Sequence, residues 1–90
     1  MRVLLYSKAD CHLCDAFHFE LLDLQSELGF AYEKRHLQEN DALFAQFDGY
    51  FPVVDIETDE HIRLTSPTSQ RQLRARIRQS AVLSAPAQTL

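Results

Sequence analysis

Residues 3–14 read VLLYSKADCHLC, an apolar run followed within a few positions by two cysteines. The almost wholly apolar segment at residues 2–6 predicts a strand that is buried on both faces of an open sheet. Beyond it, apolar residues recur every three or four positions: Leu13, Phe17, Leu21, Leu24 and Leu28. This spacing predicts an amphipathic helix that begins at the cysteines and ends before Gly29. Two thiols are therefore expected where a strand passes into a helix.

The position of Cys11 and Cys14 favours reactive thiols. A helix N-terminus carries a partial positive charge and unpaired N–H groups, so it can lower a cysteine pKa from about 8.5 to roughly 3.5–7.5. With two residues between them, the second sulfur can reach back to the first across one helical turn. Two cysteines are too few for the disulfide framework of a secreted mini-domain, and a close pair beside a strand–helix–strand pattern is typical of redox chemistry.

A second strand and a short second helix are expected next. Residues 30–36 have strand character, and the long helical crossover implies that this strand runs parallel to the first. Asn40 or Asp41 can cap a short helix that closes at Gly49. The apolar side chains of that helix are Leu43, Phe44 and Phe47.

The last part of the chain predicts a hairpin and a third helix. Residues 52–56 and 61–64 are two short strand-like segments joined by a polar turn. Ser69 and Gln72 fit a capping box, which marks the start of the last helix. The expected fold is therefore α/β in the order βαβαββα, with a four-stranded mixed sheet and three helices.

Length and composition predict one small domain. The chain has 90 residues, of which 46% are hydrophobic, enough for a modest core. We expect the domain to span residues 1–83 and residues 84–90 to form a flexible C-terminal tail. Because there is no apolar stretch of about 18 residues and no signal-peptide pattern, we expect a cytoplasmic protein that does not engage membranes.

The charge is divided unevenly along the chain. Residues 1–60 hold all thirteen acids against four Lys or Arg, and residues 61–90 hold five Arg and no acid, so the two parts carry −9 and +5. The arginines of the last helix are Arg71, Arg74, Arg76 and Arg78. That helix has no aromatic residue for base stacking, and the whole chain is acidic, so we expect no nucleic-acid partner. A solvated helix face, or docking to an acidic protein, explains these arginines better.

Together with the predicted order, residues 4–14, LLYSKADCHLC, resemble the strand, loop and active-site turn of glutaredoxin-like proteins in the thioredoxin superfamily. The string CHLCD at residues 11–15 is similar to a small bacterial glutaredoxin-like family. The resemblance covers about residues 1–80 and implies a thiol–disulfide oxidoreductase that reduces or exchanges disulfides. By its place at the helix start Cys11 is the expected nucleophile, and Cys14, one turn further, is the expected resolving thiol.

The resemblance also implies how a substrate binds. It implies that Pro52 is cis and lies opposite the dithiol, with the backbone of Phe51 free to pair with an extended thiol substrate. The alternative is a trans proline that begins an edge strand. Lys8 matches the lysine that glutaredoxins place near the reactive sulfur, where it could stabilise the thiolate and attract a glutathione carboxylate. The alternative for Lys8 is an ordinary solvated lysine.

Charged residues beside the cysteines act in opposite directions. His12 replaces the proline of many relatives, and a protonated imidazole there would stabilise the thiolate; the alternative is a surface histidine without that role. Asp10 and Asp15 would raise the pKa of a neighbouring thiol. Asp10 is also a candidate for the helix N-cap.

One departure from the resembled family concerns glutathione. Classical glutaredoxins have a Gly-Gly turn and an acidic residue after the fourth strand, whereas residues 64–69 here read LTSPTS. Thr68 or Ser69 could still offer a hydroxyl and a helix N-terminus to a carboxylate. This departure argues against glutathione as the dedicated cosubstrate, although it could still take part in the exchange. No tightly bound cofactor is expected.

Two classes of function follow from the sequence. The first is the oxidoreductase, acting as a monomer on protein or small-molecule thiols and disulfides. The second is a noncatalytic thioredoxin-fold binding or redox-sensing module, in which Cys11 and Cys14 bind a metal or sense redox state and the arginine-rich last helix docks a partner. His18 lies on the same helical face as the cysteines and is a candidate third ligand, although no fourth is visible. An iron–sulfur cluster shared between two copies is a minor alternative.

Overall fold

The computed structural model describes residues 1–84. The elements follow one another as β1 (Arg2–Ser7), α1 (His12–Leu28), β2 (Ala31–His36), α2 (Ala42–Phe47), β3 (Val53–Glu57), β4 (His61–Leu64) and α3 (Gln70–Ser84). This is the βαβαββα order that the sequence predicts. The third helix ends at Ser84, where the expected tail begins, and the rest of that tail lies outside the described residues.

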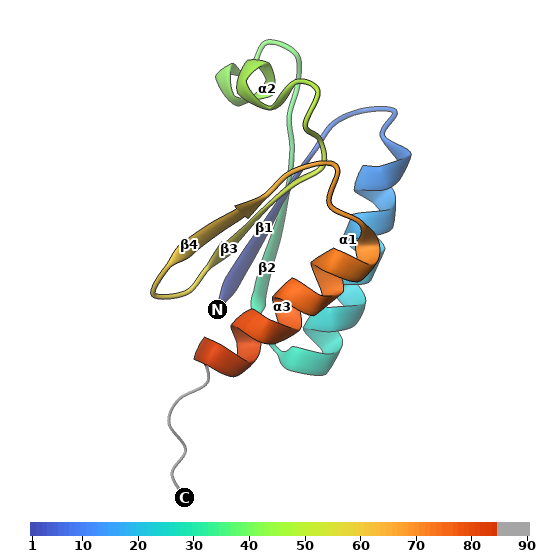
Figure 1. The fold of residues 1–90 in the computed structure, drawn as a ribbon. Coiled ribbons are helices and arrows are strands. Elements are labelled where there is room, and N and C mark those ends of the chain that lie inside the picture. Colours follow the sequence, from blue (N-terminus) through green and yellow to red (C-terminus); the bar gives the residue numbers. More distant parts are fainter. Residues whose placement is uncertain (85–90) are drawn as a thin grey trace, which may run out of the picture.

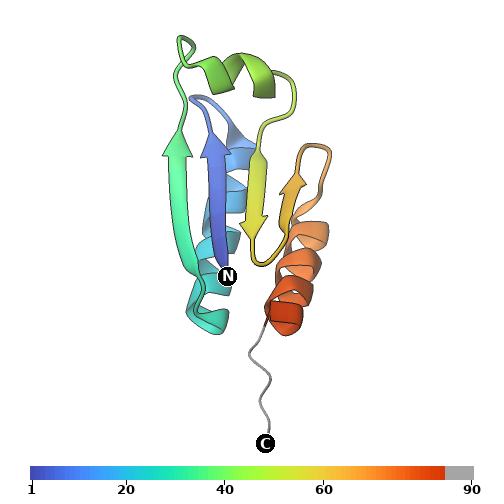
Figure 2. The same ribbon diagram turned by 90° about the vertical axis from the view of Figure 1, so that its left-hand side faces the viewer.

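The four strands form one mixed sheet in the order β2-β1-β3-β4 (Figure 2). β1 and β2 are parallel, whereas β3 is antiparallel to both β1 and β4. The central position of β1 explains why five consecutive residues, 3–7, are buried. β2 lies at an edge, and most of its side chains are exposed.

The helices are distributed unequally around the sheet. α1 and α3 lie side by side on one face, and α2 lies across one end of the sheet (Figures 1 and 2). β1 ends, and α1 begins, at this same end (Figure 1). The fold therefore brings the segment with the cysteines and the segment around α2 to one end of the sheet.

Two apolar clusters make up the core. The helix-side core lies between the sheet and the helices α1 and α3, and its members are Val3, Leu5, Phe17, Leu21, Leu24, Phe30, Val54, Ile56, Leu73 and Ile77. The α2-side core lies near α2 and the start of α1, and its members are Leu4, Tyr6, Cys14, Leu37, Phe47, Phe51 and Val53. One of the two cysteines is thus a full member of the core.

Local signals in the sequence explain where the helices begin and end. Gly29 follows α1 with φ +78°, and its N–H donates to the carbonyl of Gln25 over 2.8 Å. Asp41 caps α2 by accepting from the N–H of Leu43 at 2.9 Å. Ser69 and Gln72 form the expected reciprocal capping box, with bonds of 2.8 and 3.1 Å.

The cap of α1 differs from one of the expectations. Asp10 is not the N-cap, because that position is held by Cys11, whose sulfur accepts from the N–H of Cys14. Asp10 instead has φ +56°, in the left-handed region that Asp and Asn tolerate better than most side chains. It turns the chain from the loop into the helix.

An ion pair lies on the sheet face opposite α1 and α3. The carboxylate of Asp55, 3% exposed, accepts from Nε and Nη2 of Arg63 at 2.7 and 2.8 Å, and His61 lies 3.3 Å away. Burial alone would raise the pKa of Asp55, but the hydrogen bonds and charge of Arg63, with a smaller effect of His61, lower it below its ordinary value. The guanidinium also lies 5.0 Å from the ring centre of Phe47. The ion pair of Asp55 and Arg63 follows from the strand register, because these two residues lie opposite each other across β3 and β4.

Within residues 1–84, no helix is both long enough and apolar enough to cross a membrane.

Candidate functional site

Cys11 and Cys14 are joined by a disulfide, with their Cα atoms 5.2 Å apart. Cys11 has an extended backbone, with φ −121° and ψ 97°, and caps α1. The N–H of Cys14 donates to Sγ of Cys11 over 3.1 Å, and the N–H of Asp15 donates to the carbonyl of Cys11 over 3.2 Å. The first sulfur therefore lies at the positive end of the helix, where a thiolate would be stabilised when the disulfide opens.

The two cysteines differ in their exposure. Cys14 is fully buried in the α2-side core, whereas Cys11 is half-buried and packs against the margin of that core. His12 and Leu13 lie between them in the first turn of α1, and both are exposed, Leu13 by 56%. Of the two residues, Cys11 is therefore the one that a substrate approaching from solvent meets first.

Lys8 and Phe51 come together beside the cysteines. The Nζ of Lys8 lies 5.7 Å from the centre of the Phe51 ring, and Phe51 shares the α2-side core with Cys14. The Phe51–Pro52 peptide bond is cis, as the resemblance implies, and Pro52 is buried. The structure therefore gathers Lys8, Phe51 and the two cysteines into one region, with His12 exposed at its surface.

A cleft lies next to Lys8. It has a volume of about 450 Å³ and is lined by residues from three segments: Lys8, Ala9, Asp10, His36, Leu37, Gln38, Glu39 and Phe44. Phe44 forms one wall and also stacks on Phe51 with 5.4 Å between the ring centres. The sequence analysis did not single out His36, Gln38 or Phe44 as site residues, because only the tertiary fold brings α2 and the end of β2 to Lys8.

Hydrogen bonds hold the turn between β4 and α3, most of them within the turn and one to a neighbouring loop. Thr68 Oγ1 donates to the carbonyl of Thr65 at 2.7 Å, and the Ser69 hydroxyl and N–H both belong to the capping box. The N–H of Ser66 donates to the carbonyl of Tyr50 at 3.0 Å, and the Ser66–Pro67 bond is also cis. The Thr68 hydroxyl hydrogen and the Ser69 N–H, two groups that could hold a glutathione carboxylate, are thus bonded within the protein, whereas the Ser69 hydroxyl oxygen acts there as an acceptor.

His18 has a partner outside the dithiol. Its Nδ1 lies 2.8 Å from the hydroxyl of Tyr32 on β2, and burial and then the charge of Lys34 lower its pKa. Burial also raises the pKa of Tyr32. Over residues 1–84, no group of three or more His, Cys, Asp and Glu side chains is arranged to hold a metal ion. His18 therefore packs between α1 and β2 rather than completing a site with the cysteines.

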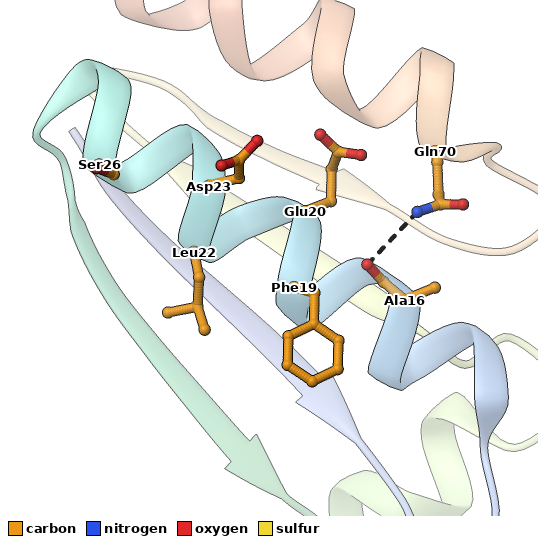
Figure 3. A pocket seen from close by; sticks show the side chains of 7 residues that line it. All are labelled: Ala16, Phe19, Glu20, Leu22, Asp23, Ser26 and Gln70. Atoms are coloured by element: carbon orange, nitrogen blue, oxygen red, sulfur yellow. Dashed lines mark hydrogen bonds between the residues drawn. The ribbon is translucent and has the colours of Figure 1, made fainter.

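A second hollow, of about 520 Å³, is lined by residues of α1 and by Gln70 of α3 (Figure 3). Phe19 and Leu22 point to one side of it and Glu20 and Asp23 to the other, and Gln70 of α3 donates to the carbonyl of Ala16 at 3.5 Å (Figure 3). Phe19 is 66% exposed. Neither a cysteine nor a histidine lines this hollow.

Comparison with known proteins agrees with the geometry. The family model described as glutaredoxin-like domain (DUF836) matches residues 2–78, which is most of the chain and includes both cysteines. No curated protein matches the chain significantly.

Three solved structures share the fold. Thioredoxin 1 from Thermosipho africanus has a TM-score of 0.73 and 18% identity, covering 93% of this chain and 98% of its own. A malarial protein has a TM-score of 0.65 and 23% identity, with coverage of 87% and 93%. A structural genomics target protein, XcR50 from X. campestris, has a TM-score of 0.60 and 23% identity, with coverage of 86% and 96%. At these identities the likeness shows the fold alone, and it confirms the expected thioredoxin-like architecture.

Proposed function

The chain belongs to the glutaredoxin-like domain family, and from this premise we propose that it is a thiol–disulfide oxidoreductase working through Cys11 and Cys14. The observation that carries the proposal is the inequality of the two sulfurs. One caps a helix and is half-buried, and the other is fully buried one turn away at disulfide distance. A dithiol catalyst requires this division between an attacking and a resolving thiol.

The reaction consists of two exchanges. The thiolate of Cys11 attacks one sulfur of a substrate disulfide, so a mixed disulfide forms and the other substrate thiolate leaves. Cys14, as a thiolate, then attacks the sulfur of Cys11, and the second substrate thiolate leaves. The substrate gains two electrons and the protein becomes the Cys11–Cys14 disulfide, the state that the structure represents. A thiol donor returns the protein to the dithiol.

Four residues around the sulfurs are proposed to bind the substrate. Lys8 supplies a positive charge, and Phe51 supplies an apolar surface and a backbone to pair with an extended chain. Pro52 fixes the backbone at that point, and His12 lies at the rim of the site. The contact between Lys8 and Phe51 supports this grouping, because it places a charged and an aromatic side chain together beside the dithiol.

The proposed substrates are protein or small-molecule disulfides in the cytoplasm, and the enzyme is proposed to act on them as a monomer. We do not assign glutathione a dedicated role, because the turn after β4 has no Gly-Gly pair and the Thr68 hydroxyl already donates to the carbonyl of Thr65. The reductant is therefore proposed to be another dithiol or a general thiol.

A redox titration tests the proposal. The purified protein is equilibrated in thiol–disulfide buffers of known potential, and the states of Cys11 and Cys14 are determined by alkylation and mass. A reversible disulfide with a potential between about −270 and −120 mV, and turnover of a small disulfide, are expected. Cys11→Ser should abolish turnover, and Cys14→Ser should accumulate a mixed disulfide at Cys11.

The same experiment distinguishes the oxidoreductase from the noncatalytic binding or redox-sensing module. A reversible Cys11–Cys14 disulfide without turnover of any disulfide substrate would support the redox-sensing module instead. If no such disulfide forms at any potential, dithiol catalysis is excluded.

A further inference from the structure

The side chain of Ser7 is a buried hydroxyl without a hydrogen-bond partner. The residue is 2% exposed, and its Oγ has no partner among the described residues. Its backbone is satisfied normally, since its carbonyl accepts from the N–H of Leu37 at 2.8 Å. Burying a hydroxyl without a partner is costly, so such a group calls for a partner that this state of the protein lacks.

Strand and helix geometry place Ser7 beneath the dithiol. Side chains alternate along β1, so Ser7 shares the face of Val3 and Leu5, which belong to the helix-side core. α1 runs back along this face (Figure 1), and its buried stripe consists of Cys14, Phe17, Leu21 and Leu24. Ser7 ends the strand row, and Cys14 ends the helix stripe, at the same end of the sheet.

Cys14 also belongs to the same core as the neighbours of Ser7 in the chain and in the sheet. Cys14 belongs to the α2-side core together with Tyr6 and Leu37. Tyr6 is the chain neighbour of Ser7, and Leu37 is the residue whose N–H bonds to the Ser7 carbonyl. Both neighbours of Ser7 thus belong to the core that contains Cys14, so the end of β1 and the start of α1 lie close together.

Cys14 requires a hydrogen-bond donor when it acts. A cysteine attacks as a thiolate, and a negative charge on a sulfur buried among apolar side chains is unfavourable. The N–H of Cys14 cannot serve its own sulfur, because it already donates to Sγ of Cys11. A hydroxyl beneath the helix can donate, and a hydrogen bond to a charged group is roughly twice as strong as one between neutral groups.

We propose that Ser7 is the hydrogen-bond donor that stabilises the thiolate of Cys14 during resolution of the mixed disulfide, an inference that rests on the proposed function. In that step the Cys14 thiolate attacks Sγ of Cys11, the bond from Cys11 to the substrate breaks, and the substrate thiolate leaves with the electron pair. Ser7 keeps its proton throughout. Once the Cys11–Cys14 bond has formed, the sulfur is neutral and the hydroxyl loses its acceptor, which accounts for the unpartnered Oγ in the disulfide state.

A two-phase reaction measures this step directly. The reduced protein is mixed with dithiobisnitrobenzoate, an aromatic disulfide that yields a coloured thiolate. Attack by Cys11 releases the first equivalent, and attack by Cys14 releases the second. Cys14→Ser identifies the phases, because it retains only the first. Both phases are followed from mildly acidic to alkaline pH.

Ser7→Ala is expected to leave the first phase unchanged and to slow the second by about ten- to a hundredfold near neutral pH. The midpoint of the second phase should move to higher pH by about one to two units, since each tenfold loss of thiolate corresponds to one pH unit. Ser7→Thr, which retains a hydroxyl, should restore most of the rate. Ser80→Ala, which removes another buried serine hydroxyl on α3, should change neither phase.

Three results would overturn the inference: an unchanged second phase in Ser7→Ala, a loss that is equal at every pH, or the same loss in Ser7→Thr. The last two would indicate disturbed packing rather than a lost donor. Failure of the proposed function is distinguishable, because in that case the wild-type protein itself would not release the second equivalent.

Discussion

The N–H of Cys14 donates a hydrogen bond to Sγ of Cys11 over 3.1 Å, so one sulfur serves both as a redox atom and as the cap of α1. A thiolate is a better acceptor for this bond than a disulfide sulfur, because the bond is then charge-assisted. The helix and the redox state are therefore coupled at a single atom. Opening the disulfide strengthens the cap, and the cap in turn favours the thiolate of Cys11.

Substitution at Cys11 should separate its two roles. Under reducing conditions, Cys11→Ser retains a capping oxygen, whereas Cys11→Ala leaves the first turn without an acceptor. We expect Cys11→Ala to have a free energy of unfolding about 1 kcal/mol below that of Cys11→Ser, although both lack activity. Urea denaturation of the two variants measures the difference. Equal stabilities would show that the sulfur contributes nothing as a cap.

Lys8 should accelerate attack on negatively charged disulfides. Lys8→Gln removes the positive charge beside Phe51, and we expect a several-fold loss in the rate of Cys11 attack on dithiobisnitrobenzoate. Attack on the neutral bis(hydroxyethyl) disulfide should change little. Lys34→Gln is the matched control, because it removes the same charge from an exposed position on β2. An equal loss with both disulfides would contradict an electrostatic role.

Arg63 should matter for stability because it pairs with a carboxylate that is almost inaccessible to solvent. Arg63→Met leaves Asp55 without its bidentate partner. The expected loss in the free energy of unfolding at neutral pH is about 2 kcal/mol, less than for a fully buried pair because Arg63 is 41% exposed. Arg2→Met, whose partners Glu33 and Glu57 are themselves exposed, should change stability by less than about 0.5 kcal/mol.

The Asp55 pair also predicts a pH dependence. Burial raises the pKa of Asp55, but Arg63 and, to a smaller extent, His61 lower it. The net result in the folded protein is a pKa below the ordinary value of 3.8. The resulting stability is fully present above pH 3.8 and is lost as pH falls through the lower folded value. In Arg63→Met only the smaller effect of His61 opposes burial, so stability should be lost at higher pH than in the wild type. Urea titrations over a series of acidic pH values measure this, and superimposable acid limbs would contradict it.

The unpartnered hydroxyl of Ser7 should lower the free energy of unfolding of the disulfide state. Ser7→Ala removes a buried hydroxyl without a partner, so we expect the oxidised protein to gain about 1 kcal/mol in its free energy of unfolding. Ser80→Ala serves as the reference for removing a buried serine hydroxyl. Thermal unfolding of the oxidised proteins provides the comparison. A loss of stability in Ser7→Ala would mean that the hydroxyl has a partner in the disulfide state.

Most of the fold could be predicted from local signals. The three- and four-residue spacing of apolar side chains defined α1, Gly29 ended it, and Ser69 with Gln72 marked the start of α3. The cap of α1 was the exception. An aspartate before a helix is a common cap, so Asp10 was a reasonable candidate, but the cysteine sulfur took that position.

The candidate site was only partly visible in the sequence. The two cysteines stood out because only two residues separate them in the chain, and so did Pro52 once the resemblance was recognised. The wall formed by Phe44 and His36 could not be foreseen, since it depends on how α2 and the end of β2 fold over Lys8. The Asp55 pair could not be foreseen, because the predicted turn at residues 57–60 would place Asp55 opposite Ile62, whereas the strand register of the structure pairs it with Arg63.

The short separation between the cysteines has a thermodynamic consequence. In the chain-entropy description, cross-linking residues three positions apart restricts the unfolded chain little, by about 2 kcal/mol against about 3 kcal/mol for a 15-residue loop. The strands and the buried stripes of α1 and α3 do not depend on that link. Reducing the disulfide should therefore cost the protein less stability than opening a cross-link across a longer loop would.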